Sequence, residues 1–132
     1  ENIDLRPRNN RGWDALNIAA IYSSDQRIVT ALIDAGADIN SVNNRGWSAL
    51  MHAAASGHEH VVSTLIDAGT DINLVNNRGW SALMCASHKG YIDTVRAILY
   101  DDNGNQRNGV NVNFQSGYYI LEILRSLNKK KI

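Results

Sequence analysis

Apolar residues occur along the chain in short bursts separated by polar turns, and the same order of bursts occurs three times. In the middle copy, residues 49–55 are helix formers that follow Ser48, a residue type favoured at helix N-termini, and Gly57 supplies a stop. A second helix is expected from about residue 58 to 67, and Gly69 then closes it. Its apolar positions fall on one helical face: Val61, Val62, Leu65 and Ile66. Each pair of helices is too small to bury its apolar face alone, so the pairs are expected to stack.

One octapeptide marks the start of each copy. The sequence Asn-Asn-Arg-Gly-Trp-Ser-Ala-Leu at residues 43–50 recurs almost unchanged at 9–16 and 76–83. The glycines Gly12, Gly46 and Gly79 stand 34 and 33 residues apart, which is a spacing typical of stacked structural repeats. Asn-Asn-Arg-Gly is a turn signal, and short strand-like residues flank it, so a hairpin-like finger is predicted before each first helix.

The middle copy, residues 43–75, carries several further motifs in a fixed order. After the turn come Gly-x-Ser-x-Leu, Ala-Ala, Gly-His, Val-Val-x-x-Leu-Ile and Gly-x-Asp-Ile-Asn. This order resembles the ankyrin repeat throughout, and the resemblance covers roughly residues 3–113. It implies an all-α ankyrin-repeat solenoid, in which each unit has two antiparallel helices and a projecting β-hairpin finger.

The resemblance divides the chain into segments. Residues 1–8 end a preceding repeat, and ankyrin repeats follow at 9–42, 43–75 and 76–115. The third repeat contains a polar insert at 102–108, rich in Asn and Gly, which is expected to be a surface loop. Residues 116–132 are expected to form a C-terminal capping helix with a basic tail. Because the chain begins inside a repeat, we expect it to be a fragment of a longer protein.

The first helices depart from the family pattern, which opens Thr-Pro-Leu-His with local hydrogen bonds between Thr and His. The first repeat opens Asp14-Ala-Leu-Asn17 instead, and the next two open Ser-Ala-Leu-Met. We therefore expect this hydrogen-bond network to be absent and the repeats to be less stable than the family consensus. The first repeat also has one extra residue and no glycine between its helices, so an irregular loop is expected within residues 19–26.

Composition narrows the function classes. Hydrophobic residues make up 44% of the 132 residues, and thirteen basic residues balance thirteen acidic ones. A net charge of zero argues against nucleic acid and anionic membranes as partners. No long apolar run suggests a membrane span or a secretory signal. The single cysteine, Cys85, can form no intramolecular disulfide, which favours a reducing compartment and a cytoplasmic location.

The strongest functional signal is a row of Asn, Arg and Trp on the predicted fingers. The resemblance to ankyrin repeats implies that these positions contact partners. Trp and Arg often dominate binding energy at protein interfaces. The candidate residues are Asn10, Arg11, Trp13, Asn44, Arg45, Trp47, Asn77, Arg78 and Trp80. Alternatively, each Trp packs on the neighbouring finger and its Arg covers it by a cation–π contact, since identical residues in every repeat also suit packing between repeats.

A second candidate set lies at the ends of the first helices, where the repeats differ from one another. The family also uses these positions for specificity, although solvated loop ends would explain the variation equally well. The residues are Ile21, Tyr22, Ala55, Ser56, His88 and Lys89.

Other chemistry finds less support in the sequence. His52, Cys85 and His88 could converge on a metal, but a fourth ligand is not evident and packing between repeats is the preferred interpretation. Residues 101–105 are similar to the start of a calcium loop that lacks its glycine and its final glutamate. No catalytic pattern and no cofactor motif stands apart from the repeats. Asn40 and Asn73 resemble the hairpin asparagines that asparaginyl hydroxylases modify in some ankyrin proteins.

The sequence thus predicts a non-catalytic, monomeric module that binds another protein through a rigid concave surface of fingers and first helices. One alternative is a targeting or regulatory segment of a larger enzyme, such as a bacterial effector. Another is an architectural spacer without a partner of its own. A nucleic-acid interpretation of the Arg and Trp row, by base stacking, is disfavoured by the zero net charge.

Overall fold

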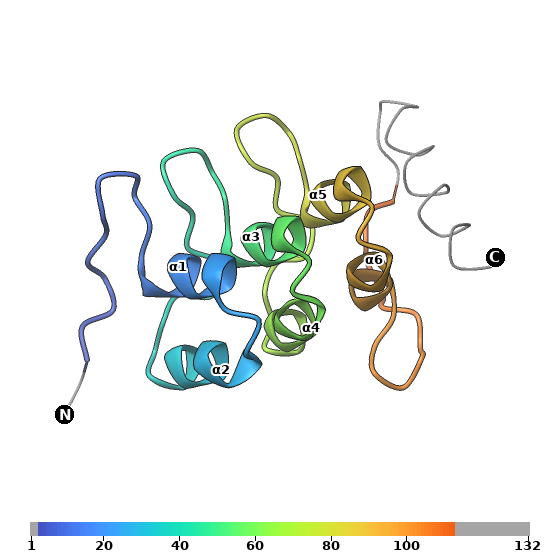
Figure 1. The fold of residues 1–132 in the computed structure, drawn as a ribbon, viewed down its shortest axis with the longest axis horizontal. Coiled ribbons are helices and arrows are strands. Elements are labelled where there is room, and N and C mark those ends of the chain that lie inside the picture. Colours follow the sequence, from blue (N-terminus) through green and yellow to red (C-terminus); the bar gives the residue numbers. More distant parts are fainter. Residues whose placement is uncertain (1–2, 113–132) are drawn as a thin grey trace.

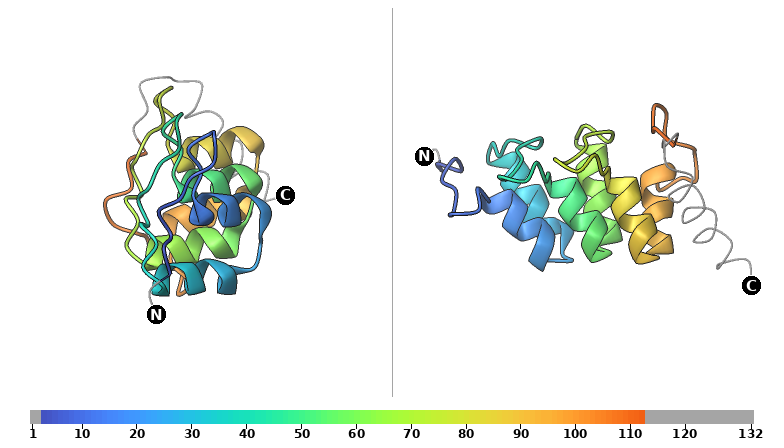
Figure 2. Two further views of the ribbon diagram at one scale, coloured as in Figure 1. Left: turned by 90° about the vertical axis from the view of Figure 1, so that its left-hand side faces the viewer. Right: turned by 90° about the horizontal axis from the view of Figure 1, so that it is seen from above.

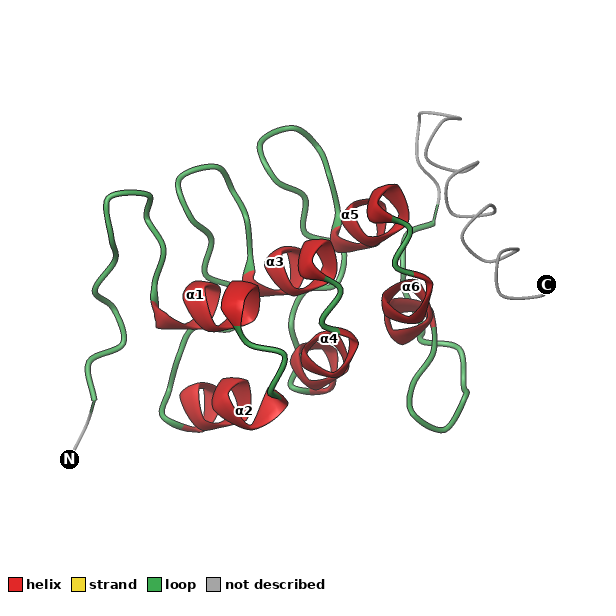
Figure 3. Cartoon of the chain, viewed as in Figure 1, coloured by secondary structure: helices red, strands yellow, loops and turns green. Residues whose placement is uncertain are grey.

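Two rows of short helices make up the computed structural model, which describes residues 3–112 (Figure 1). The inner row contains α1 (Ala15–Tyr22), α3 (Ala49–Ser56) and α5 (Ala82–Lys89). The outer row contains α2 (Gln26–Asp34), α4 (Glu59–Asp67) and α6 (Ile92–Leu99). Each helix packs against the next one in its row and against its partner in the other row. Figure 3 shows helices and loops but no strand in the described residues, which confirms the predicted all-α repeat solenoid.

A finger precedes each inner helix. The three fingers project side by side from one edge of the stack, and a view along the stack shows them rising beside the helix pairs (Figures 1 and 2). Two of them close with a single antiparallel bridge, between Val42 and Ser48 and between Val75 and Ser81. The predicted hairpin-like finger is therefore present, with one bridge at its base in place of a β-ladder.

The first asparagine of each octapeptide shapes its finger. Oδ1 of Asn43 accepts hydrogen bonds from the backbone N–H groups of Arg45 at 2.9 Å and Trp47 at 3.0 Å. Asn9 and Asn76 make the same pair of bonds in their own fingers. These bonds satisfy amides that a tight turn leaves without a backbone partner, so the repeated Asn is explained by the fold.

The inner helices are capped as the sequence predicts. Oγ of Ser48 accepts a hydrogen bond from the Met51 N–H at 3.3 Å, and Gly57 ends α3 in the left-handed conformation at φ 73°. In the first repeat, Asp14 and Asn17 form a reciprocal capping box, with bonds of 2.9 and 3.2 Å. The sequence predicted that the hydrogen bonds made by Thr and His in the family are missing at the start of this helix. For the first repeat that prediction was wrong, because Asp14 and Asn17 make an equivalent pair of hydrogen bonds.

The core lies between the two rows of helices. Equivalent leucines and valines of the three repeats are buried in it: Leu16, Leu50, Leu83, Val29, Val62 and Val95. The loop between α1 and α2 is three residues long, Ser23 to Asp25, and has an extended C-cap in place of glycine, as expected. His58 Nε2 lies 2.9 Å from the carbonyl oxygen of Ile21 and so joins two repeats.

The polar insert forms a loop that points away from the three fingers (Figure 1). Residues 102–106 are exposed, as predicted, and the loop is closed by a bridge between Tyr100 and Gln106. Arg107 departs from the expected solvated loop, because its side chain is only 10% exposed. Its guanidinium donates to the carbonyl of Ala97 and pairs with Asp67 at 2.9 Å, which anchors the insert to α6 and α4. The predicted capping helix at 116–132 lies outside the described residues.

Candidate functional site

A groove of about 530 Å³ opens between the second and third fingers, beside α3 and α5. We call it the inter-finger groove. Most of its lining residues belong to the two candidate sets drawn from the sequence, since it unites Arg and Trp of the fingers with the variable ends of the inner helices. The lining residues are Arg45, Trp47, Ala55, Asn76, Asn77, Arg78, Trp80, Cys85, His88 and Lys89.

The tryptophans are half-buried, and each touches a histidine ring. Trp47 and Trp80 pack against the core. The ring of His52 stacks on Trp47, with centroids 5.1 Å apart, and meets the edge of Trp13 at 5.4 Å. Trp80 meets the ring of His88 edge-on at 5.2 Å. The two tryptophans of the groove therefore pack on the protein interior and also contribute to the groove wall.

Hydrogen bonds between neighbouring fingers fix the width of the groove. The N–H of Asn77 donates to the carbonyl of Arg45 at 3.0 Å, and its side-chain Nδ2 donates to the carbonyl of Asn44 at 3.3 Å. Asn44 makes the same two bonds to the first finger, at 3.1 and 3.3 Å. The second asparagine of the octapeptide therefore links the fingers into a ladder, and this role accounts for its repetition.

The cations of the groove differ from four other arginines of the described residues. Arg45, Arg78 and Lys89 are exposed, and no carboxylate of residues 3–112 forms an ion pair with them. Those four arginines are paired with aspartates: Arg6 with Asp4, Arg8 with Asp14, Arg27 with Asp25 and Arg107 with Asp67. The groove thus presents positive charges that no carboxylate of the described residues neutralises through an ion pair.

Several predicted residues lie outside this groove: Asn10, Arg11, Trp13, Ile21, Tyr22, Asn44 and Ser56. Arg11 covers the Trp13 ring at 5.7 Å, which is the cation–π contact expected if the row serves packing. Tyr22 is 74% exposed at the end of α1. The structure therefore gathers most candidates of the second and third repeats, except Asn44 and Ser56, and leaves those of the first apart.

Sequence reasoning did not assign two of the lining residues to the site. Asn76 shapes its finger, as described above, and Cys85 is buried on α5. Burial raises the pKa of the Cys85 thiol to about 12, so the thiol stays protonated and unreactive at neutral pH. The position of Cys85 in the repeat, equivalent to that of His52, was the available signal for its burial.

The possible metal and calcium sites gain no support from the geometry. Within residues 3–112, no three His, Cys, Asp or Glu side chains are grouped so that they could hold a metal ion. Burial lowers the pKa of His52 to about 4, although attraction to Asp14 opposes this shift. The carboxylate of Asp101 accepts hydrogen bonds from the N–H groups of Asn103 and Asn105, both at 2.9 Å. These bonds lower its pKa and engage it in the turn.

Comparison with known proteins agrees with the geometry. A family model described as ankyrin repeats (3 copies) matches residues 16–113. No curated protein matches the chain. In the described part of the chain, none of the helices combines the length and the apolar character that crossing a bilayer requires.

Proposed function

Because the chain belongs to the ankyrin repeat family, whose repeats generally mediate protein–protein interaction, we propose that it binds another protein through its fingers and inner helices. The inter-finger groove is the centre of the proposed surface. One observation carries this choice: the groove brings Arg and Trp, which are constant between repeats, together with His88 and Lys89, which vary. A constant base and a variable side suit a scaffold that recognises one particular partner.

The proposed mechanism is rigid presentation. Finger-to-finger hydrogen bonds and the half-buried tryptophans hold the groove in place before a partner arrives. Little conformational entropy then remains to be lost on binding, so more of the contact energy is available as affinity.

The remainder of the proposal follows the family and the composition. The role is non-catalytic, as is typical of ankyrin repeats. We propose that the chain acts as a monomer and binds neither nucleic acid nor membrane, in line with its zero net charge. A cytoplasmic location is supported by the single cysteine, which is free and buried.

Site-directed photo-crosslinking tests the proposed surface. A photoreactive phenylalanine analogue is placed at His88, in the groove, and in a matched protein at His60, which is exposed on α4 outside it. We expect proteins from the source cells to be captured at His88 and not at His60. A captured protein is then purified and titrated against the parent and the Arg78→Ser variant.

Two results would contradict the proposal. One is equal capture at both positions. The other is unchanged affinity of the purified partner for the Arg78→Ser chain. Either would show that the partner is held by a different surface.

A further inference from the structure

We propose that the inter-finger groove binds an acidic segment of a partner protein, with an aromatic or aliphatic side chain placed next to its carboxylates. This inference rests on the proposed function and specifies the chemistry of the partner.

The lining of the groove is positively charged. Arg45, Arg78 and Lys89 line the groove, and its lining contains no Asp or Glu. Four carboxylates line a separate hollow beside the outer helices α4 and α6: Glu59, Asp93, Asp101 and Asp102. Although the formal net charge is zero, the lining of the groove therefore carries positive charge without a compensating carboxylate. Such a surface attracts an acidic segment and repels a basic one.

The two arginines of the groove differ from Arg8 and Arg107 in their contacts with the rest of the protein. Arg8 and Arg107 donate hydrogen bonds to backbone carbonyls and also pair with carboxylates, so their charges serve the fold. Arg45 and Arg78 are exposed and pair with no carboxylate of residues 3–112. An arginine guanidinium matches a carboxylate with two parallel hydrogen bonds. These two side chains on neighbouring fingers can therefore bind acidic residues at little cost to the fold.

The tryptophans supply the apolar part of the site. Trp47 and Trp80 belong to neighbouring fingers, are fixed by packing on the core, and keep part of each indole exposed. An apolar side chain inserted between them would bury surface against rigid rings, which is the typical arrangement of an interface hot spot. The groove volume of about 530 Å³ lies in the range of pockets that hold a few side chains, which favours a short segment.

Nucleic acid is the other polyanion with both charge and stacking surfaces. A single strand requires cations along an extended path. Here three cationic side chains surround one hollow and do not form an extended track. The arrangement therefore favours an acidic protein segment, and nucleic acid becomes one outcome of the test.

A random-peptide phage library is the probe, selected on the immobilised full chain of residues 1–132. Enriched peptides are synthesised and titrated against the parent and against a triple variant, Arg45→Ser with Arg78→Ser and Lys89→Ser. The control variant, Arg6→Ser with Arg27→Ser, removes exposed cations that lie outside the groove. Circular dichroism checks that all three proteins are folded.

We expect the enriched peptides to carry Asp or Glu around an aromatic or aliphatic residue. The triple variant should bind them at least about tenfold more weakly, the control variant should bind them normally, and added salt should weaken binding to the parent.

The alternative outcomes separate this inference from the proposed function. Peptides that need the groove but are not acidic, or a failure to enrich any peptide, would overturn the inference and leave the proposed function standing. Acidic peptides that bind the triple variant as tightly as the parent would overturn both. Displacement of the peptides by single-stranded DNA that binds the groove more tightly would also overturn the inference, in favour of nucleic acid.

Discussion

The ring of His52 stacks on Trp47, with ring centroids 5.1 Å apart and an interplanar angle of 23°. The edge of Trp13, from the preceding repeat, meets the same imidazole at 5.4 Å. The sequence left two interpretations of the Trp row open, packing between repeats or a surface for a partner. The geometry makes them compatible, since the half-buried Trp47 packs on the core and also lines the inter-finger groove.

We expect Trp47→Ala to lower the free energy of unfolding by about 1–3 kcal/mol, the range for a lost half-buried contact. Trp13→Ala is the matched control, because Trp13 is half-buried but does not pack against the core cluster. Urea unfolding should show a clearly smaller loss for Trp13→Ala, and iodide should quench the parent's tryptophan fluorescence only in part. Equal losses for the two variants would contradict the packing described for Trp47.

The burial of His52 predicts a pH dependence of stability. Its pKa in the folded chain is lowered from 6.5 to about 4, first because burial disfavours the charged ring. Well above pH 6.5 the ring is neutral in both states, so it adds no pH dependence. As the pH falls from about 6.5 to about 4, the unfolded chain binds a proton that the folded chain does not, and stability falls by about 3 kcal/mol in total.

The variant His52→Gln isolates this contribution, because glutamine keeps a polar side chain of similar length and does not titrate. Urea unfolding of both proteins between pH 7 and pH 4 should give a difference in stability that changes in favour of the variant as the pH falls. If the difference stays constant with pH, the ring is protonated as easily in the folded chain as in the unfolded one, and the burial argument fails.

Much of the fold could be predicted from the sequence because the same local signals occur in each repeat. Ser48 as N-cap, Gly57 as C-cap and the finger turns all involve neighbours in the sequence, and the structure confirms them. The capping box of Asp14 and Asn17 was missed because the prediction compared residue types with Thr and His. Asp and Asn carry different groups that can make an equivalent pair of bonds.

The site was harder to predict, because it depends on contacts between repeats. From the sequence, the constant finger residues and the variable helix ends were two separate candidate sites. No local pattern indicated that residues of both sets, from the second and third repeats, line one groove. The anchoring role of Arg107 was also missed, since its partners Ala97 and Asp67 belong to two different helices. An isolated arginine in a polar insert gives no local signal of such long-range bonds.

Gly46 should tolerate alanine less well than Gly79, although both have φ near 78°. At Gly79, an added Cβ meets nothing within 4 Å, so the cost is only that of the left-handed conformation, about 1–2 kcal/mol. At Gly46, the Cβ would lie 2.6 Å from Oδ1 of Asn77 and 3.0 Å from its backbone nitrogen, so the next finger must move. Urea unfolding of the two alanine variants should show a larger loss for Gly46→Ala. Equal losses would show that the fingers can shift freely.

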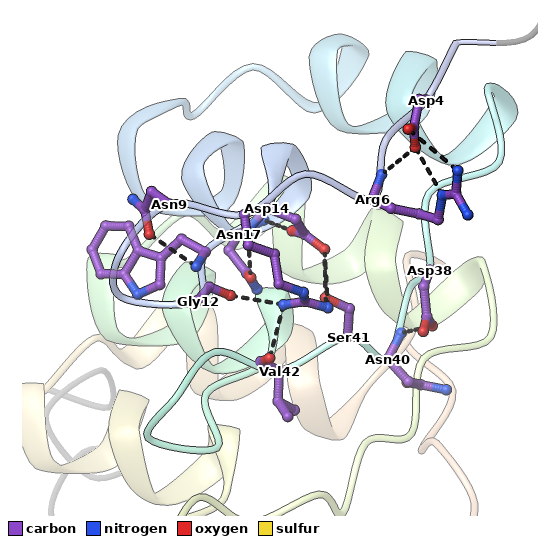
Figure 4. Close-up of polar contacts among 12 residues, drawn as sticks. Asp4, Arg6, Asn9, Gly12, Asp14, Asn17, Asp38, Asn40, Ser41 and Val42 are labelled. Carbon is purple, nitrogen blue, oxygen red and sulfur yellow. Dashed lines mark hydrogen bonds and ion pairs between the residues drawn. The ribbon is translucent and has the colours of Figure 1, made fainter.

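The ion pair of Arg8 and Asp14 is expected to stabilise the first two fingers. Figure 4 shows Asp14 beside Ser41, with Gly12 and Val42 nearby. Asp14 is buried, with 6% of its surface exposed, and it also accepts a hydrogen bond from Ser41. Arg8 lies 3.9 Å from its carboxylate and donates to the carbonyls of Gly12 at 2.7 Å and Val42 at 3.0 Å. Arg8 thereby joins the first finger to the second and compensates a buried negative charge.

We expect Arg8→Met to lower the free energy of unfolding at neutral pH by about 1–3 kcal/mol, because it leaves the Asp14 carboxylate buried with less compensation. The matched control is Arg6→Met, whose ion pair with Asp4 is exposed and should contribute little to stability. The double variant Arg8→Val with Asp14→Ser copies the residues that hold these positions in the second repeat, Val42 and Ser48, and should recover much of the loss. If Arg8→Met unfolds at the same urea concentration as Arg6→Met, the pair is no more than a surface contact and Asp14 is stabilised by Ser41 and its capping bonds alone.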